Sequence, residues 1–329
     1  MKSNVRIERD ADVSRLTTFG VPARAAAVAR WTTADDLRAI LADASLPRPL
    51  KVIGGGSNLL FTKPFVGTLL VREGEPYVGF DGLLCTADCQ VGLSRLCEIV
   101  ASQGLRGMEN LCGIPGTLGG ALVQNAGAYG AETGSLLHEA ELFDLLTGDT
   151  LTVGRDWMKY SYRHSKLKED GDRYVIMKAT LRLLPASAPA NLDYGNLRAT
   201  MGDAEPTPAA VCEAVVRVRD SKLPDPRKVG SAGSFFRNPE VDASKLTEDM
   251  PRYDLGNGLY KVPAAWLIDR AGMKGARAGG ASTWPLQPLV IVNTDGHATA
   301  ADVVELENLI ISAVEARFAI TLTPEVEHL

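Results

Sequence analysis

The 329-residue sequence lacks several features that would place it in a specialised class of protein. No apolar run approaches the roughly 20 residues of a membrane-spanning helix, and the opening residues MKSNVRIERDADVSR carry no apolar segment typical of a secretory signal. The 35 Lys and Arg do not outnumber the 40 Asp and Glu, and the net charge of −5 disfavours bulk nucleic-acid binding. We therefore expect a cytoplasmic globular protein that binds neither membranes nor nucleic acid.

Cysteine and histidine are also scarce, with five and four residues. The cysteines form an odd, scattered set: Cys85, Cys89, Cys97, Cys112 and Cys212. Without a secretory signal, such a set favours reduced core thiols over disulfides. The pair Cys85 and Cys89 has no second Cys or His pair nearby, as a zinc site would require. We predict no metal site.

Glycine, in contrast, is concentrated in one stretch, Gly107–Glu132, with the sequence GMENLCGIPGTLGGALVQNAGAYGAE. Glycine costs conformational entropy, so this density indicates that a ligand or another backbone comes close, or that several N–H groups point inward together. Interleaved apolar residues favour a packed loop over the alternative of an ordinary surface turn. The stretch has no helical or strand periodicity.

A second glycine cluster follows a short apolar segment, Leu50–Ile53, which we predict to be a buried strand. The strand runs into Gly54-Gly55-Gly56-Ser57-Asn58, a second candidate phosphate cradle. The longer stretch, Gly107–Glu132, matches neither the Rossmann nor the P-loop pattern. A tight turn explains one cluster equally well, but two such loops favour a nucleotide-like ligand.

Two further stretches carry candidate chemistry. Lys159–Lys166, KYSYRHSK, is cationic and aromatic, and it is either a solvated loop or an anion clamp centred on Arg163. Gly230–Pro239, GSAGSFFRNP, places Ser234 among small residues before two aromatics. The second stretch is not a GxSxG nucleophile elbow, which disfavours a serine hydrolase.

Local patterns predict mixed α and β structure without internal repeats. Threonines at 33, 207 and 299 are predicted N-caps. The predicted helices cover 34–44, 93–103, 208–219, 261–271 and 300–317, and the predicted strands cover 50–53, 67–71, 83–86, 136–145, 149–153, 174–184 and 289–292, with an opening strand within 17–31.

Taken in order, these motifs resemble the UDP-N-acetylenolpyruvoylglucosamine reductase family, the MurB family of peptidoglycan precursor synthesis, over nearly the full chain. The motifs are Thr18-Phe-Gly, Gly54-Gly-Gly-Ser-Asn-Leu-Leu, Asn110-Leu-Cys-Gly-Ile-Pro-Gly, Gln124-Asn-Ala-Gly-Ala-Tyr-Gly, Tyr162-Arg-His-Ser, Lys222-Leu-Pro-Asp-Pro, Ala232-Gly-Ser-Phe-Phe-Arg-Asn-Pro, Ala265-Trp-Leu-Ile-Asp and Pro324-Glu-Val. Each motif is modest alone, and the ordered set is specific.

The resemblance implies an α+β fold: a two-lobed FAD-binding PCMH-type (vanillyl-alcohol-oxidase-like) flavoprotein fold plus a C-terminal α+β substrate domain. The implied division is 1–70 for the first FAD-binding lobe, 71–220 for the second lobe with a substrate loop, 221–318 for the substrate domain, and 319–329 for a tail that returns to the active site.

The implied activity is that of an NADPH-dependent oxidoreductase with non-covalent FAD, expected to be monomeric. NADPH reduces flavin N5, and the hydride then passes to C3 of the enolpyruvyl group of UDP-N-acetylglucosamine enolpyruvate, with protonation at C2, to give UDP-N-acetylmuramate. The family supplies the preference for NADPH, since no motif here discriminates it from NADH.

The resemblance also assigns residues. Ser234 corresponds to the proton donor, Arg163 to the cation beside the substrate carboxylate, and Glu325 to the acid acting on that carboxylate. Tyr194 on the substrate loop, Lys222, Asn238 and Gln287 correspond to substrate-binding positions. The implied FAD-binding residues are Gly54, Gly55, Gly56, Ser57, Asn58, Ile114, Pro115, Gly116, Thr117, Gly119, Gly120, Gln124, Asn125, Gly127, Ala128, Tyr129 and Gly130.

One departure and two alternatives remain. Glu327 stands where the family often has a basic residue, which makes the local charge more negative. An FAD oxidase of the same superfamily acting on a sugar would not need Ser234, Arg163 and Glu325 together. A nucleotide-binding paralogue without activity would be expected to have lost one of the three.

Overall fold

The computed structural model describes residues 5–329, which form two compact units. The first unit consists of Ala25–Gly55 and Val66–Ser221 with the segment that ends at Ala11, and the second consists of Asp12–Arg24, Gly56–Phe65 and Lys222–Leu329. Each unit is therefore assembled from segments far apart in the sequence. The predicted division at residues 70, 220 and 318 stays a prediction.

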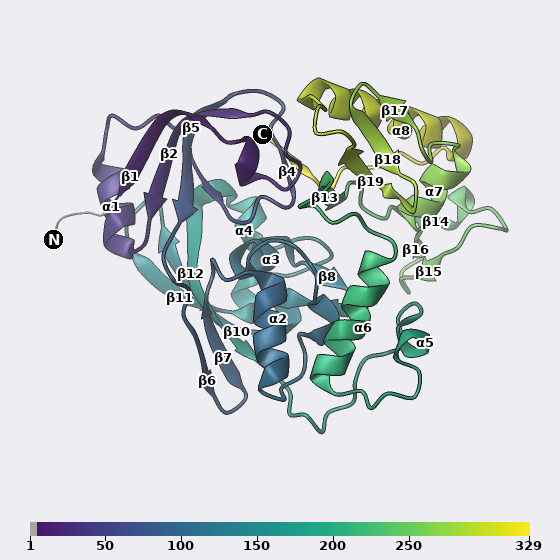
Figure 1. Cartoon of the computed structure of the whole chain (residues 1–329), viewed down its shortest axis with the longest axis horizontal. Coiled ribbons are helices and arrows are strands. Elements are labelled where there is room, and N and C mark those ends of the chain that lie inside the picture. Colours follow the sequence, from purple (N-terminus) through teal and green to yellow (C-terminus); the bar gives the residue numbers. More distant parts are fainter. Residues whose placement is uncertain (1–4) are drawn as a thin grey trace. The chain divides into compact units, whose positions relative to one another are not determined.

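One sheet of the first unit contains the N-terminal strands in the order β1-β2-β5-β3 (Figure 1). Its elements are β1 (Arg6–Asp12), β2 (Arg24–Trp31), α1 (Ala34–Ala42), β3 (Leu50–Ile53) and β5 (Phe65–Arg72). Strands β3 and β5 are parallel. Helix α1 begins with a complete capping box between Thr33 and Asp36, as the sequence predicts, and Leu37 and Ile40 pack against Trp31 and Leu70.

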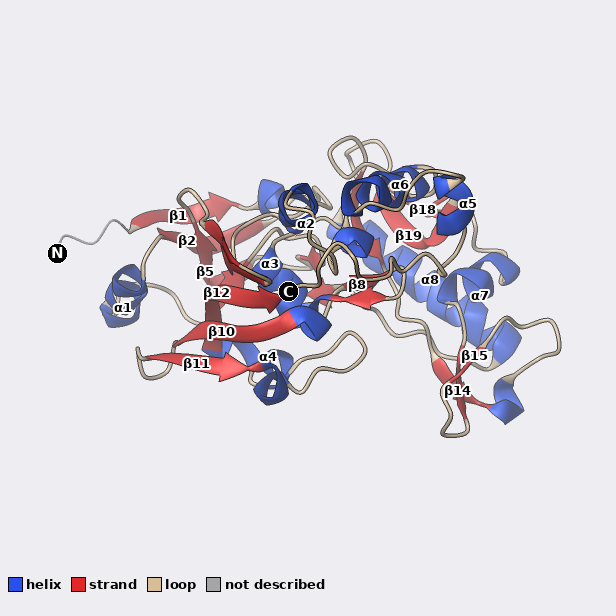
Figure 2. Ribbon diagram, turned by 90° about the horizontal axis from the view of Figure 1, so that it is seen from below, coloured by secondary structure: helices blue, strands red, loops and turns tan. Residues whose placement is uncertain are grey.

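The second sheet of this unit is antiparallel, in the order β11-β10-β12-β7-β6. Figure 2 shows β12, β10 and β11 side by side. Its strands are β6 (Val78–Asp81), β7 (Leu84–Asp88), β10 (Leu137–Asp144), β11 (Thr150–Gly154) and β12 (Tyr174–Arg182). The helices are α2 (Leu93–Ser102), α3 (Leu118–Gln124), α4 (Lys166–Glu169), α5 (Leu197–Met201) and α6 (Pro208–Asp220). A short hairpin consists of β8 (Gly127–Ala128) and β9 (Ala131–Glu132). The unit also contains the 3-10 turns η2 (Glu109–Leu111), η3 (Thr133–Leu136), η4 (Arg155–Met158) and η5 (Gly171–Arg173). Helices α2 and α6 contribute Leu96, Val100, Val211 and Val215 to its core.

Helix α3 corrects the expectation that the glycine-rich stretch has no regular structure. Thr117 caps the helix by accepting a hydrogen bond from the Gly120 N–H, and Asn125 ends it in the left-handed conformation with φ of 48°. Burial of Leu118 and Leu122 supplies the packing that the glycines do not.

The second unit is built around the sheet β13-β19-β18-β17 and helix α8, which was predicted from its Thr299–Asp302 capping box. Its elements are η1 (Ser14–Leu16), β4 (Leu59–Leu60), β13 (Gly230–Ser234), β14 (Glu240–Asp242), η6 (Ala243–Lys245), β15 (Tyr253–Asp254), β16 (Leu259–Lys261), α7 (Ala264–Arg270), β17 (Arg277–Ala278), β18 (Ala281–Trp284), β19 (Gln287–Asn293), α8 (Ala300–Phe318) and β20 (Glu327–His328). Helix α7 starts three residues later than predicted, because Lys261 pairs with Glu240 in the sheet β14-β16-β15.

The cysteines also correct the prediction that all five are reduced. Cys112 and Cys212 form a disulfide with their Cα atoms 5.4 Å apart. Cys85, Cys89 and Cys97 are free and buried. Burial raises the pKa of the Cys85 thiol to about 11 and also raises the pKa values of Cys89 and Cys97, so these thiols are weak nucleophiles at neutral pH.

Candidate functional site

The predicted phosphate cradle brings two glycine segments of the first unit into contact. A Cβ atom on Gly55 would lie 2.6 Å from the Gly116 Cα, and one on Gly54 would lie 2.7 Å from the Thr117 Oγ1. Any side chain there would force the two segments apart. Gly54, Gly55 and Gly120 are exposed. Two exposed backbone segments that require glycine at their contact fit the pyrophosphate of a dinucleotide such as FAD.

The remaining residues of the first glycine cluster belong to the second unit. Gly56 has a φ of 59°, and its Cβ would lie 1.8 Å from the Leu16 carbonyl oxygen. Its own carbonyl accepts a hydrogen bond from the Thr18 N–H at 3.1 Å. Gly56 is therefore fixed by its own backbone contacts, and Ser57 and Asn58 follow it.

Asn125 holds the second half of the glycine-rich stretch. Its side chain is fully buried and donates to the Glu132 carboxylate at 3.0 Å and to the Ser161 carbonyl at 2.9 Å, while its Oδ1 accepts from the Gly134 N–H at 3.0 Å. Asn125 thus connects the loop after α3 to the segment that carries Arg163. These side-chain bonds make Asn125 a structural clamp within the predicted FAD-binding set.

Arg163 lies directly over this loop. Its guanidinium donates to the Gly127 carbonyl at 2.9 Å and to the Asn125 carbonyl at 3.5 Å, and it lies 5.3 Å from the centre of the Tyr162 ring. Arg163 has a φ of 55°, in a turn closed by mutual backbone bonds between Ser161 and His164. A loop that twists a non-glycine residue into this region to aim a guanidinium is typical of a functional position.

The segment after Arg163 is tied to α3 as well. Ser165 donates to the Val123 carbonyl at 2.6 Å, and Lys168 donates to the Gln124 Oε1 at 2.7 Å. Gln124 thus orients its neighbours within the unit. The structure therefore brings Gln124, Asn125, Gly127 and Arg163 together, as the resemblance implies.

Tyr129 and Tyr194 meet at the far end of the glycine-rich stretch. Their rings are 6.0 Å apart with an interplanar angle of 87°, an edge-to-face contact. Burial raises the pKa of the Tyr129 hydroxyl, which the charge of Arg219 partly offsets. Burial of the Arg219 guanidinium lowers the pKa of that group. Sequence reasoning missed Arg219, because a cation in the last turn of a helix looks ordinary.

In the second unit, Ser234 ends strand β13 and is exposed, between Gly233 at a φ of 70° and the fully buried Phe235. The segment with Glu325 runs along the residues that follow Ser234. The Glu325 N–H donates to the Phe235 carbonyl at 2.8 Å, and the Arg237 N–H donates to the Thr323 carbonyl at 3.0 Å. The structure therefore places the backbone of the predicted acid beside the residue that follows the predicted proton donor.

Asn58 and the tail secure Glu325 from the other side. The Asn58 side chain donates to the Glu325 carbonyl at 3.0 Å, and its own carbonyl accepts from the Glu327 N–H at 3.0 Å. Strand β20 pairs in parallel with β4, which places Glu327 opposite Leu59 and His328 opposite Leu60. Asn58 thus holds the backbone around Glu325, a contact that its predicted role in FAD binding did not include.

The predicted substrate-binding residues of this unit are spread over three elements. Asn238 accepts a hydrogen bond from the Ala264 N–H at 2.9 Å, at the start of α7. Lys222 is exposed, and its carbonyl accepts from the Trp284 indole at 3.0 Å. Gln287 is half-buried at the start of β19. Asn238 is therefore orientated by α7, with its amide nitrogen available as a donor.

Two negative findings concern the described part of the chain only. None of the helices between residues 5 and 329 is at once long enough and apolar enough to cross a bilayer. The same residues contain no group of three or more His, Cys, Asp or Glu side chains arranged to hold a metal ion.

Comparisons with known proteins agree with the geometry. Residues 225–329 match the C-terminal domain of UDP-N-acetylenolpyruvoylglucosamine reductase, and residues 25–154 match an FAD binding domain. The chain is 39% identical to the UDP-N-acetylenolpyruvoylglucosamine reductase of Azoarcus sp. (strain BH72), over 97% of this chain and 96% of the relative. It is 36% identical to the Pseudomonas aeruginosa reductase, over 98% of both chains.

A solved structure is similar over the same length. The crystal structure of UDP-N-acetylenolpyruvylglucosamine reductase from Thermus caldophilus superimposes with a TM-score of 0.71 at 25% identity, covering 98% of this chain and 99% of that one. The predicted fold class, an FAD-binding PCMH-type domain with a C-terminal domain of the reductase type, is confirmed.

Proposed function

Because the chain belongs to the UDP-N-acetylenolpyruvoylglucosamine reductase family, we propose that it uses NADPH to reduce UDP-N-acetylglucosamine enolpyruvate to UDP-N-acetylmuramate. The protein is an FAD-dependent oxidoreductase of peptidoglycan precursor synthesis. One observation carries the finer proposal: an exposed serine, Ser234, ends a strand whose next residue is hydrogen-bonded to the backbone of Glu325.

The first unit fits FAD. Gly54 and Gly55 contact Thr117 and Gly116 so closely that a Cβ atom would clash there, and the exposed backbone of Gly54 and Gly55 offers N–H groups to a pyrophosphate. FAD, when bound, supplies the redox chemistry of hydride transfer. The further residues proposed to hold it are those of the Ile114–Gly130 segment assigned by resemblance, with Ser57 and Asn58 after the first glycines.

Arg163 is proposed to stabilise the charge that develops on the substrate carboxylate when C3 receives hydride. Its guanidinium is fixed by carbonyls of the predicted FAD-binding loop, so the positive charge needs little reorganisation. Glu325 is proposed to contact the same carboxylate, with its backbone held by Phe235 and Asn58.

Ser234 is proposed to protonate C2, after which water or solvent-exposed groups restore its proton. An alcohol is a weak acid, and it serves here because C2 becomes strongly basic once C3 has gained hydride and because pairing with Val290 in β19 fixes the backbone of Ser234. Lys222, Asn238, Gln287 and Tyr194 are proposed to bind the UDP-sugar, with the ammonium of Lys222 on the diphosphate.

The test separates the two half-reactions. Under anaerobic conditions, NADPH should bleach the flavin absorbance, and UDP-N-acetylglucosamine enolpyruvate should restore it without oxygen. In Ser234→Ala, bleaching should remain while substrate-driven recovery slows by about 10²-fold or more. Ser102→Ala removes a hydroxyl that bonds within α2 and should leave both steps unchanged.

The same experiment judges the alternative. Bleaching by NADPH without recovery by this substrate, but with recovery by oxygen, would favour an oxidase acting on a sugar. Equal recovery rates in Ser234→Ala and wild type would remove Ser234 from the proposed chemistry.

A further inference from the structure

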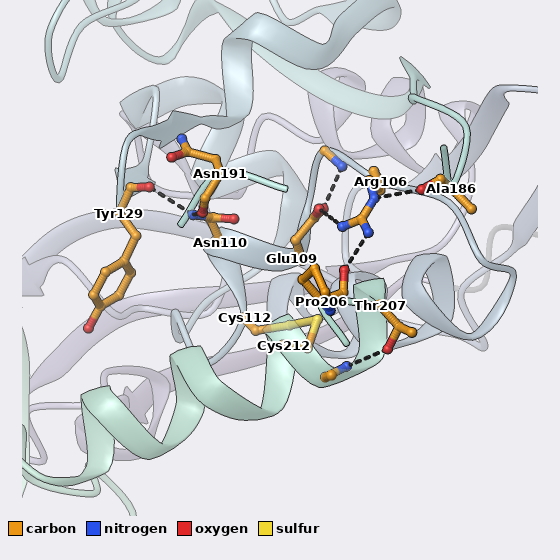
Figure 3. A network of polar contacts seen from close by, with 12 residues as sticks. Arg106, Glu109, Asn110, Cys112, Tyr129, Ala186, Asn191, Pro206, Thr207 and Cys212 are labelled. Atoms are coloured by element: carbon orange, nitrogen blue, oxygen red, sulfur yellow. Dashed lines mark hydrogen bonds and ion pairs between the residues drawn. A yellow bond between two sulfur atoms is a disulfide. The ribbon is translucent and has the colours of Figure 1, made fainter. Parts of the chain in front are cut away.

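The buried carboxamide of Asn110 holds two separate segments of the first unit at once. Asn110 lies in η2 and is 3% exposed, and its amide nitrogen donates to the Tyr129 carbonyl at 2.8 Å and to the Asn191 carbonyl at 2.9 Å (Figure 3). Both N–H groups of the carboxamide are therefore used on backbone oxygens. Because a buried polar group left without its bonds is costly, this side chain fixes the separation of the two carbonyls.

One of the two segments belongs to the predicted FAD-binding loop. Tyr129 has a φ of 48°, a conformation that a non-glycine residue adopts only when its surroundings hold it. The bond from Asn110 to its carbonyl is one such restraint. The next residue, Gly130, lies against the Asn191 side chain, whose amide nitrogen donates to the Gly130 carbonyl at 3.4 Å and would lie 2.9 Å from a Cβ on Gly130. The FAD-binding loop and the Asn191 segment thus touch directly.

The other segment carries Tyr194. Two residues lie between Asn191 and this tyrosine, which is 50% exposed and has its ring edge-to-face with Tyr129. The substrate loop, the segment between Ala186 and Pro206, is also fixed at both ends by one buried guanidinium. Arg106 donates to the Ala186 carbonyl at 2.9 Å and to the Pro206 carbonyl. Glu109 pairs with this guanidinium at 3.2 Å, as Figure 3 shows. Between the two fixed ends, Asn110 provides an internal attachment.

We propose that Asn110 is a positioning residue that couples the FAD-binding loop to the substrate loop. When residues 113–130 take the arrangement that holds FAD, the carbonyl of Tyr129 fixes Asn110, and Asn110 fixes Asn191 and so places Tyr194 for the UDP-sugar. The inference rests on the proposed function, because it assumes that Tyr194 contacts the substrate.

A double-mutant cycle on the FAD-loaded, oxidised enzyme tests the coupling. Calorimetry would give the Kd of UDP-N-acetylglucosamine enolpyruvate for wild type, Asn110→Ala, Tyr194→Ala and the double variant. Losing the two hydrogen bonds should raise the Kd about 3- to 10-fold in Asn110→Ala. The double variant should bind the substrate no more weakly than Tyr194→Ala. A Kd raised by the product of the two single-variant factors would overturn the proposal.

Asn293→Ala is the matched control. Asn293 is also 3% exposed and donates to two backbone carbonyls, those of Phe19 and Gly20, but in the second unit. Asn293→Ala should lower the free energy of unfolding as Asn110→Ala does. Any change that it causes in the Kd for the substrate should be the same factor in the wild-type and Tyr194→Ala backgrounds.

Limited proteolysis of the wild-type protein gives a second readout that does not need a folded variant. Arg198 is an exposed trypsin site in the substrate loop. Removing FAD should speed cleavage after Arg198 several-fold, and an equal rate with and without FAD would overturn the proposal. A wild-type protein that fails to bind the substrate while FAD still protects Arg198 would overturn the proposed function and leave the coupling of the loops supported.

Discussion

Gly55 occupies a position that has no room for a side chain, since the atoms nearest to a Cβ there are the Gly116 Cα at 2.6 Å and the Gly116 carbonyl carbon at 3.1 Å. Gly55→Ala should separate the two glycine segments at a cost of about 1–3 kcal/mol, which raises the Kd for FAD about 5- to 100-fold. Fluorescence titration of the apoprotein with FAD measures this change.

A glycine elsewhere in the same unit provides the control. Gly154 has a φ of −88°, and the nearest atom to its Cβ would be the His138 carbonyl oxygen at 3.8 Å. Gly154→Ala should bind FAD as tightly as wild type. Unchanged FAD affinity in Gly55→Ala would show that the segments do not need their contact to hold the cofactor.

Asp144 is a second residue with a testable consequence. It is 5% exposed and accepts three hydrogen bonds from Arg173, the shortest at 2.7 Å from Nη2. These bonds, more than any other contact, lower the pKa of the Asp144 carboxyl. A lowered carboxyl pKa means that the ionised form stabilises the fold above the ordinary pKa of Asp, about 3.9, and that this stability is lost as pH falls through the folded value.

Asp144→Asn should therefore reduce the free energy of unfolding by about 1–2 kcal/mol near neutral pH, since 42% of the Arg173 side chain is exposed and solvent weakens the pair. The deficit should begin to shrink as pH falls below about 4, where the carboxyl protonates in the unfolded chain, and should be smallest below the lowered pKa of the folded carboxyl. Urea unfolding at several pH values measures it. Asp35→Asn breaks an exposed pair with Arg38 and should change stability by less than about 0.5 kcal/mol. A deficit in Asp144→Asn that grows on acidification would contradict the argument.

At the scale of elements, local signals predict helices α1, α2, α6, α7 and α8 but miss α3, α4 and α5. Thr33, Thr207 and Thr299 cap α1, α6 and α8 as predicted, because a cap and an apolar face lie within one stretch of sequence. Helix α3 has two glycines in seven residues, and beyond its Thr117 cap it is stabilised by burial of Leu118 and Leu122 in a core shared with distant segments. Propensity cannot reveal such a helix, since its stability is tertiary.

The disulfide links two elements, η2 and α6, that are 100 residues apart. Spacing gave no sign of this pair, because a link between distant segments depends on the fold. In protein purified without reductant and then denatured, thiol titration should find the three free cysteines, and it should find all five after reduction. Reduction should lower the free energy of unfolding by about 2–4 kcal/mol.

Cys212→Ala is the control for the count. Its denatured chain should show four thiols both before and after reduction, because Cys112 has lost its partner. Five thiols in the unreduced wild-type protein would refute the link.

At the scale of the whole molecule, the motifs predicted the family, which the comparisons confirm, while the site residues stay a prediction and the mixing of chain segments was not predictable from local pattern. Which glycine meets which, as Gly55 meets Gly116, depends on the packing of α3 against the sheet. The second unit likewise needs Phe19, Val21 and Leu60, which lie more than 150 residues before the rest of its core. No sequence period marks such long-range partners.

This assembly predicts how a fragment behaves. Residues 222–329 alone lack the backbone partners of β20 and of Ser231, which are Leu59, Leu60 and Thr18. The fragment should show the near-ultraviolet circular dichroism signal of a packed core only when residues 12–24 and 56–65 are supplied. Fusing those segments to the fragment provides the control. A cooperative thermal transition in the fragment alone would contradict the requirement.

The same arrangement has a consequence during synthesis. Phe19 and Gly20 leave the ribosome early, yet Asn293, whose side chain bonds both of their carbonyls, is translated about 270 residues later. At about 5–20 residues per second, the nascent chain carries these apolar residues without their partners for roughly 15 to 55 seconds. The core of the second unit therefore cannot close until residues about 270 positions after Phe19 have been made, and until then the apolar side chains around Phe19 stay exposed to other chains.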